Sequence, residues 1–200
     1  AWLFTGGAGI GKLAFARHLA QSLLCEAPQA EHQPCGQCQG CRWFASGTHP
    51  DFRLLSPFAD EEEEGKEAKA VRKLPQIKIE AVRDVIDFAH LSAHRAGRRV
   101  ILVEPAENLN PAAANALLKI LEEPPEAVLF LLVSHAQQRL LPTIRSRCRQ
   151  FALTRPGAAA ALAWLREQGV ANAEIELAHN GGAPLFDHDP ELAALRGQFV

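Results

Sequence analysis

The feature that most constrains the fold is the segment G-G-A-G-I-G-K-L at residues 6–13. It follows a short apolar stretch and precedes a run whose apolar residues recur at helical spacing: Leu13, Ala16, Leu19, Ala20 and Leu23. A glycine-rich loop between a strand and a helix binds phosphate through backbone N–H groups. A plain turn is the alternative, but Lys12 directly after Gly11 favours a phosphate-binding loop. We therefore expect Gly6, Gly11 and Lys12 to form a phosphate cradle.

One position of this loop departs from the pattern. The Ser or Thr that would bind Mg²⁺ is replaced by Leu13. A second departure follows the apolar run at residues 100–103, where ATPases of this kind carry acidic groups that bind metal and polarise water. Here that run ends in Glu104 and Pro105. We expect no ATP hydrolysis by the chain alone, and the sequence leaves open whether Lys12 and the loop amides still bind nucleotide.

The rest of the chain alternates between strand and helix patterns. Strand patterns occupy residues 52–55 and 150–153, and an apolar run typical of a buried strand occupies residues 128–133. Helical patterns occupy residues 77–89 and the stretch that begins with Asn110 as the N-cap and Pro111 as the first helical residue. This alternation predicts an α/β fold with a mostly parallel sheet and helices on both faces.

A hinge at Arg155-Pro156-Gly157 separates this pattern from the end of the chain. After it, residues 158–168 and 173–179 read as helices. We expect an α/β domain over residues 1–154 and a small helical lid domain over residues 155–200.

Four cysteines lie close together in the sequence: Cys25, Cys35, Cys38 and Cys41. In a reducing cytosol, thiolates at this spacing predict a closed tetrahedral zinc site rather than disulfides. An iron–sulfur cluster is the main rival, but its common pattern needs another Cys where this chain has Ala45. We expect one structural zinc ion in a module at residues 25–45.

Charge and hydropathy narrow the class of protein. The net charge of −2 argues against a chain that binds nucleic acid over its whole surface. No apolar run approaches the ~20 residues that span a membrane, and no secretory signal opens the chain, so we expect a cytoplasmic protein.

The acidic run at residues 60–67 predicts a solvated loop. A basic cluster, His94, Arg95, Arg98 and Arg99, predicts either a solvated loop or an anion contact.

Four arginines gather near the end of the α/β pattern: Arg139, Arg145, Arg147 and Arg149. Arg147 lies between Pro142 and the strand predicted at residues 150–153, in a turn that could hold a guanidinium rigidly. A rigid, always-charged fork suits stabilisation of a γ-phosphate on a neighbouring subunit. An ordinary exposed surface is the alternative.

Two segments carry a family resemblance: N-A-L-L-K-I-L-E-E-P-P at residues 115–125 and T-I-R-S-R-C at residues 143–148. They resemble the bacterial clamp-loader subunits of DNA polymerase III, which are AAA+ proteins, and the four-cysteine insertion is similar to theirs. The resemblance covers residues 1–153. The ATP-hydrolysing gamma/tau type keeps groups that are replaced here by Leu13, by Glu104 with Pro105, and by Pro184, so the chain is more similar to the delta-prime type.

The resemblance implies an AAA+ P-loop domain with a zinc insertion, a helical lid and a further helical collar domain beyond Val200. It makes Arg147 an arginine finger acting in trans, and Ser134 a nucleotide-sensing position. It also implies a subunit that helps place the sliding clamp on primed DNA, together with gamma/tau and delta subunits. The alternatives are an ATP-hydrolysing gamma/tau-type subunit, or a zinc-stabilised interaction module without a nucleotide role.

Overall fold

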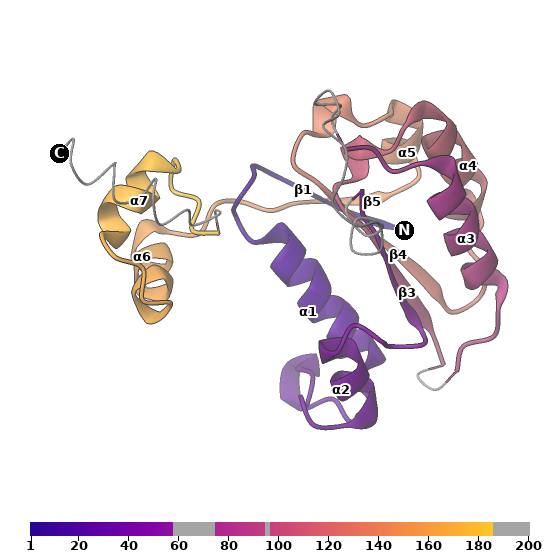
Figure 1. The fold of residues 1–200 in the computed structure, drawn as a ribbon, viewed down its shortest axis with the longest axis horizontal. Helices are drawn as coiled ribbons and strands as arrows, with labels where there is room; N and C mark the ends of the chain where they lie inside the picture. The colour runs from indigo at the N-terminus through magenta and orange to yellow at the C-terminus, as the bar shows by residue number, and fades with distance from the viewer. Residues whose placement is uncertain (58–74, 95–96, 186–200) are drawn as a thin grey trace, which may run out of the picture.

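A parallel sheet forms the centre of the computed structural model, which describes residues 1–57, 75–94 and 97–185. In these residues five strands pair in the order β2-β3-β4-β1-β5, all in parallel (Figure 1). The strands are β1 (Trp2–Thr5), β2 (Phe52–Leu55), β3 (Arg99–Val103), β4 (Val128–Ser134) and β5 (Arg149–Ala152). The predicted α/β fold with a mostly parallel sheet is confirmed.

Helices cover both faces of the sheet (Figure 1). The α-helices of the described residues are α1 (Lys12–Leu24), α2 (Gln39–Ala45), α3 (Ile79–His90), α4 (Pro111–Glu122), α5 (Pro142–Ser146), α6 (Ala158–Glu167) and α7 (Ala173–His179), of which α6 and α7 lie apart from the sheet. Alternate residues of β3 face opposite sides: Ile101 packs in the core with α3 and α4, whereas Leu102 packs in the core with α1. Because both faces are buried, the central strands are continuous apolar runs.

The register of the strands brings their carboxyl ends to one edge. Thr5 pairs with Ser134, and Val103 pairs with Leu132. The phosphate-type loop after β1 and the segments that follow β3 and β4 therefore leave the sheet side by side. Crevices at this edge are where open parallel sheets bind ligands.

The segments α6 and α7 pack on each other through a small core of their own: Ala161, Leu165, Ala173 and Leu177. The predicted helices are confirmed, while the domain boundary near residue 154 stays a prediction. After α7 the chain returns to the sheet edge, where the Leu185 backbone N–H donates to the Gly9 carbonyl at 2.8 Å. Across the described ranges, every helix is too short or too polar to span a bilayer.

Two local expectations are wrong. The helix predicted from Ile77 begins at Ile79, because Ile77 is a buried residue that forms an isolated parallel bridge with Leu109. Arg99, expected in a solvated or anion-binding cluster, is instead buried in β3. Its Nη1 donates to the Phe88 carbonyl, and its Nε lies 3.6 Å from Asp51 Oδ1. The acidic run at residues 60–67 and Arg95 lie outside the described residues.

The contribution of the N-cap of α4 to stability can be tested. The Asn110 side chain accepts a hydrogen bond from the Ala113 backbone N–H at 2.8 Å, as the sequence predicts for an N-cap. We expect Asn110→Ala to lower the free energy of unfolding by about 1 kcal/mol, measured by urea denaturation. Asn115→Ala, at an exposed position of the same helix, is the matched control and should change it by less than about 0.5 kcal/mol. Equal effects of the two changes would contradict a capping role for Asn110.

Candidate functional site

The loop between β1 and α1 has the backbone of a phosphate cradle. Gly6 has a φ of +146°, and a Cβ there would lie 2.5 Å from the Leu153 carbonyl oxygen. Lys12 begins α1, is only 2% exposed, and its Nζ donates to the Gly7 carbonyl. The structure therefore brings Gly6, Gly11 and Lys12 into one loop, but the lysine ammonium is bonded back into that loop.

Carboxylates from the neighbouring segment face this lysine. Burial lowers the pKa of Lys12, while the charges of Glu107 and Glu104 act in the opposite direction. Glu104 Oε1 lies 3.1 Å from His135 Nε2. Glu107 Oε1 accepts from the backbone N–H groups of His135 and Ala136 at 2.9 and 3.0 Å. Both carboxylates thus have partners from the segment that follows β4.

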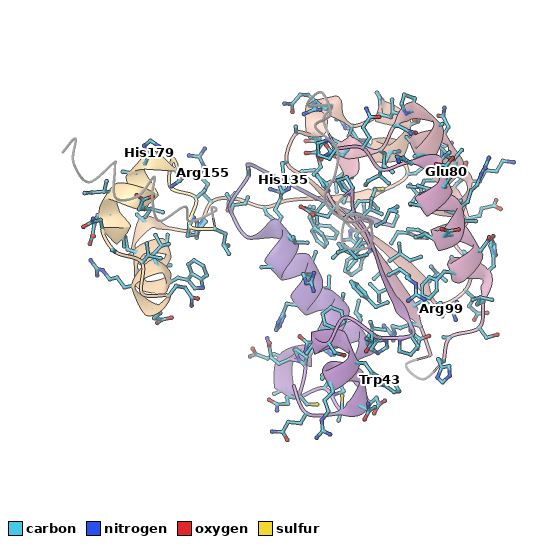
Figure 2. All side chains as sticks on the ribbon, viewed as in Figure 1. Trp43, Glu80, Arg99, His135, Arg155 and His179 are labelled. Carbon is cyan, nitrogen blue, oxygen red and sulfur yellow. The ribbon has the colours of Figure 1, made fainter. Side chains whose placement is uncertain are left out.

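His135 is a site residue that no sequence pattern singled out. It follows the buried strand β4 and lies at the edge of the sheet where the strands end (Figure 2). Its position directly after the end of a central strand is the signal that could have identified it, because such residues reach the ligand-binding edge of a parallel sheet. Ser134, the predicted sensing residue, is fully buried, and its hydroxyl has no hydrogen-bond partner among the described residues.

A cavity of about 720 Å³ opens between the glycine-rich loop, the sheet edge and the residues that follow α7. Leu13 lines it with a hydrocarbon side chain at the position of the usual magnesium ligand. Glu104 and His135 form part of another wall. Asn180, Ala183 and Leu185, which follow α7, line the opposite part of the cavity. Ser134 is not part of this lining. The cavity is large enough for a small-molecule ligand, but the metal-binding hydroxyl is missing.

The segment that follows β5 is bonded to the turn that follows α7. Arg155, labelled in Figure 2, donates from Nη1 to the Gly181 carbonyl at 2.7 Å. Pro184, at the position of the predicted sensing arginine in gamma/tau subunits, is buried beside Leu185. A Cβ on Gly9 would lie 2.8 Å from the Leu185 carbonyl oxygen, so the lid segment approaches the loop closely.

Arg147 does not line this cavity. It lies at the C-terminal cap of α5, which is a short helix where the sequence predicted a turn. Its Nε and Nη2 donate to Glu122 Oε2 at 3.1 and 3.0 Å, and its Nη1 donates to the Thr143 carbonyl at 3.0 Å. The Arg147 side chain is 29% exposed and that of Glu122 is 59% exposed, so the pair lies on the surface.

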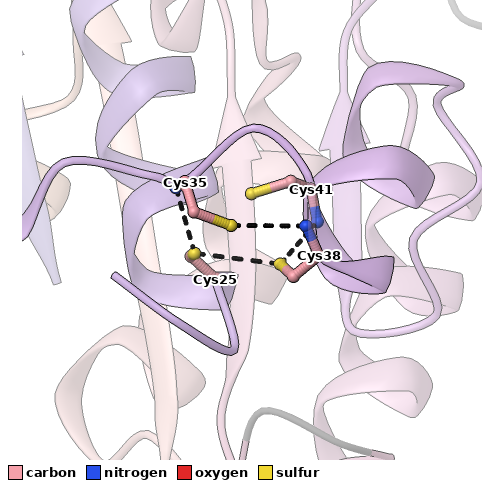
Figure 3. Close-up of side chains that lie close together, drawn as sticks. All are labelled: Cys25, Cys35, Cys38 and Cys41. Atoms are coloured by element: carbon pink, nitrogen blue, oxygen red, sulfur yellow. Dashed lines mark hydrogen bonds between the residues drawn. The ribbon is translucent and has the colours of Figure 1, made fainter. Parts of the chain in front are cut away.

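The four predicted cysteine ligands converge in space (Figure 3). Their sulfur atoms all lie within 4.8 Å of one another, and Cys25 Sγ is 3.8 Å from Cys38 Sγ. Backbone N–H groups of Cys35, Cys38 and Cys41 donate to cysteine sulfurs at 3.3, 3.3 and 3.4 Å. The sulfurs are not joined as disulfides. Such a cluster could hold a metal ion.

Ionisation is unequal within the cluster. Burial raises the pKa of the Cys38 thiol, but backbone N–H groups of Cys41 and Glu26 and neighbouring thiols outweigh burial and bring it to about 6. Burial and the Cys38 and Cys25 thiols raise the pKa of Cys41 to about 12. Cys38 therefore supplies the first thiolate at neutral pH, and thiolates are the form that binds metal.

The cysteine module lies far from the cavity. Lys12 begins α1 and Cys25 follows its last residue, and 13 residues of helix span about 20 Å at ~1.5 Å per residue. The module packs on the end of α1 through Gly40, where a Cβ would lie 2.7 Å from the Leu24 carbonyl oxygen. A metal there would stabilise the fold and would not reach a ligand in the cavity.

Comparison with known proteins gives one family. A family model described as DNA polymerase III, delta subunit, matches residues 1–156. The DNA polymerase III subunit delta' of Pseudomonas aeruginosa is 47% identical over 189 residues, which cover 92% of this chain and 53% of that protein. The Escherichia coli subunit delta' is 40% identical over 160 residues, covering 80% and 44%. The chain spans about half the length of these curated relatives.

More distant relatives share the fold. The Escherichia coli DNA polymerase III subunit tau is 38% identical over 153 residues, covering 76% of this chain and 21% of that protein. A solved structure of a gamma subunit-related protein from Thermotoga maritima has a TM-score of 0.51 and 20% identity, and the match covers 85% of this chain and 49% of that one. At this identity the structural match supports the fold alone.

Proposed function

We propose a function from the premise that this chain belongs to the DNA polymerase III delta-prime family, which is related to the gamma/tau clamp-loader subunits. The chain acts in a clamp loader that places the ring-shaped sliding clamp on primed DNA during replication. Its partners are gamma/tau and delta subunits, and its location is the cytoplasm. The observation that carries this proposal is the 47% identity to a delta-prime subunit over nearly the whole chain.

The charge of the chain supports DNA contact through the assembled complex. With a net charge of −2, this chain lacks the overall basic balance of a protein that binds DNA over its whole surface. Clamp loading is therefore an activity of the complex, in which this subunit contributes contacts and geometry.

The nucleotide site of this chain is degenerate. Leu13 offers no oxygen to Mg²⁺, and Pro105 offers no group to orient an attacking water. Glu104 is paired with His135, and Lys12 is bonded to the Gly7 carbonyl, so two further charged groups of the site are engaged within the chain. Phosphoryl transfer depends on positioning and charge stabilisation, which these replacements remove.

The isolated chain should therefore hydrolyse no ATP. The measurement is phosphate release by purified protein with Mg²⁺ and ATP, with Lys12→Ala as the control for contaminating ATPases. Any residual rate should be the same in both proteins. Turnover that disappears with Lys12→Ala would contradict the degenerate site and favour an ATP-hydrolysing gamma/tau-type function.

Arg147 acts on a nucleotide bound by a neighbouring subunit. An arginine has five N–H groups, and the contacts with Glu122 and Thr143 use three of them. Two N–H groups on a partly exposed guanidinium remain for an acceptor outside the chain. A planar, permanently charged fork of this kind is suited to the charge that develops on a transferred phosphoryl group.

We expect Arg147→Ala to lower the DNA-stimulated ATPase of the reconstituted loader. An arginine finger can contribute ~10³-fold or more at the site it serves, and other sites dilute this loss in the whole complex. Stability should change by less than about 0.5 kcal/mol. Arg147→Lys should restore little activity, because an ammonium lacks the planar fork.

Arg149→Ala, an exposed arginine two positions along the chain, is the matched control and should leave ATPase activity unchanged. Normal ATPase and clamp loading by a loader carrying Arg147→Ala would contradict the finger role. That result would favour a zinc-stabilised interaction module with no nucleotide role.

Zinc is the metal that best fits the cysteine cluster. A tetrahedral ion with Zn–S bonds of ~2.3 Å separates its sulfurs by about 3.8 Å, which is also the distance between the Cys25 and Cys38 sulfurs. A multi-iron cluster binds its cysteines through different iron atoms and needs wider spacing than the 4.8 Å limit of this group. When bound, the ion cross-links Cys25, Cys35, Cys38 and Cys41 and supplies no chemistry to the cavity.

Elemental analysis of reduced protein should give one zinc ion per chain. Cys38→Ser should lose most of the zinc and loosen residues 25–43, detected by faster hydrogen exchange there, because one of four ligands is gone. Cys148→Ala is the matched control, since Cys148 is buried in the main core away from the cluster. Iron in place of zinc, or full zinc content in Cys38→Ser, would contradict this site.

A further inference from the structure

The contact between Glu122 and Arg147 joins two elements that are far apart in the sequence. Glu122 is the last residue of α4, and Arg147, which lies 25 residues later, caps the C-terminal end of α5. Both Nε and Nη2 of the arginine donate to one oxygen of the carboxylate, at 3.1 and 3.0 Å. The contact therefore involves one full edge of the guanidinium rather than a single N–H group.

We propose that Glu122 is a positioning residue that fixes the direction of the Arg147 guanidinium toward the neighbouring subunit. This inference rests on the proposed function of Arg147. The carboxylate does not touch the nucleotide, and it acts only through the arginine that it holds.

Stability alone does not account for the contact. The Glu122 side chain is 59% exposed, and ion pairs at such positions contribute little to folding because water and salt screen them. What an exposed pair can contribute is orientation. The guanidinium is a rigid plane, so two anchors at different edges fix both its position and its tilt.

The second anchor is the Thr143 carbonyl, which accepts from Nη1 at 3.0 Å. Thr143 belongs to α5, whereas Glu122 belongs to α4, so the arginine is fixed against both helices. With these anchors in place, one N–H group on each of Nη1 and Nη2 remains for an external acceptor. These two groups lie in the plane of the guanidinium and can donate to phosphate oxygens.

The anchors themselves are rigid. Leu117 and Leu121 bury one face of α4 in the main core, and Asn110 caps its start. Ile144 is fully buried and fixes α5 to the same core. A carboxylate at the end of a well-packed helix is thus held at a defined distance from the arginine. Without it, Arg147 would keep only the Thr143 carbonyl and would sample several rotamers.

The test uses the reconstituted loader with Glu122→Gln and Glu122→Ala, and Glu123→Ala as the matched control at the adjacent exposed carboxylate. Glu122→Ala should lower kcat of the DNA-stimulated ATPase and leave KM for ATP unchanged, because the arginine acts on the transition state. At the site served by Arg147 we expect a loss of roughly 10-fold, since a misplacement of about 1 Å can cost up to ~10²-fold. Glu122→Gln should lie between Glu122→Ala and the unmodified loader, and Glu123→Ala should match the unmodified loader.

A double-variant comparison separates positioning from other roles. Adding Glu122→Ala to Arg147→Ala should produce no further loss, because the residue that Glu122 positions is already absent. An additional loss in that background, a rise in kcat, or an unchanged kcat in Glu122→Ala would each overturn the inference. Thermal unfolding of the variants should match that of the unmodified chain, and Glu122→Gln replaces Glu122→Ala in the comparison if it does not.

The same experiment distinguishes this inference from the function on which it rests. Normal ATPase with Arg147→Ala alone would mean that the proposed function is wrong. Reduced ATPase with Arg147→Ala but normal ATPase with Glu122→Ala would mean that only the positioning role is wrong.

Discussion

Parallel pairing of β1 with β4 is the interaction on which the rest of the structure depends. It aligns Thr5 with Ser134 and sends the glycine-rich loop and the segment after β4 out at the same edge of the sheet. The central strands are apolar on both sides, so helices must cover both faces before the chain can bury its core. This alignment brings Lys12, which follows β1, and His135, which follows β4, to the same cavity.

A phosphate-type loop can persist for structural reasons after its chemistry has changed. The glycines at positions 6 and 9 leave room for the carbonyl oxygens of Leu153 and Leu185, so larger residues would collide with the chain's own backbone. These glycines are therefore needed whether or not a phosphate binds. No backbone contact of this kind requires an oxygen atom at position 13, and the residue there is Leu. This combination supports the proposal that the loop keeps its fold without hydrolysing ATP.

The chain separates its tasks in space. The cysteine cluster lies at the far end of α1 from the cavity, and Arg147, at the C-terminal cap of α5, does not line the cavity. A substitution at the cysteine cluster, at the cavity or at Arg147 should therefore have little effect on the stability of the other two sites. The reason is that distant sites contribute nearly additively to the free energy of unfolding.

The sequence by itself determined the strands, the helices α1, α3, α4, α6 and α7, the Asn110 cap and the close spacing of the four cysteines, because apolar period, capping chemistry and sequence spacing are local properties. It did not predict α2, and it predicted a turn where α5 forms. Tertiary structure decided the burial of Arg99 beside Asp51 and the pairing of Glu104 with His135. These pairs join residues 48 and 31 positions apart, and no local pattern encodes which strands become neighbours. The strand order of the sheet makes them adjacent, and so it determines which charges are neutralised inside the chain and which remain available to a partner.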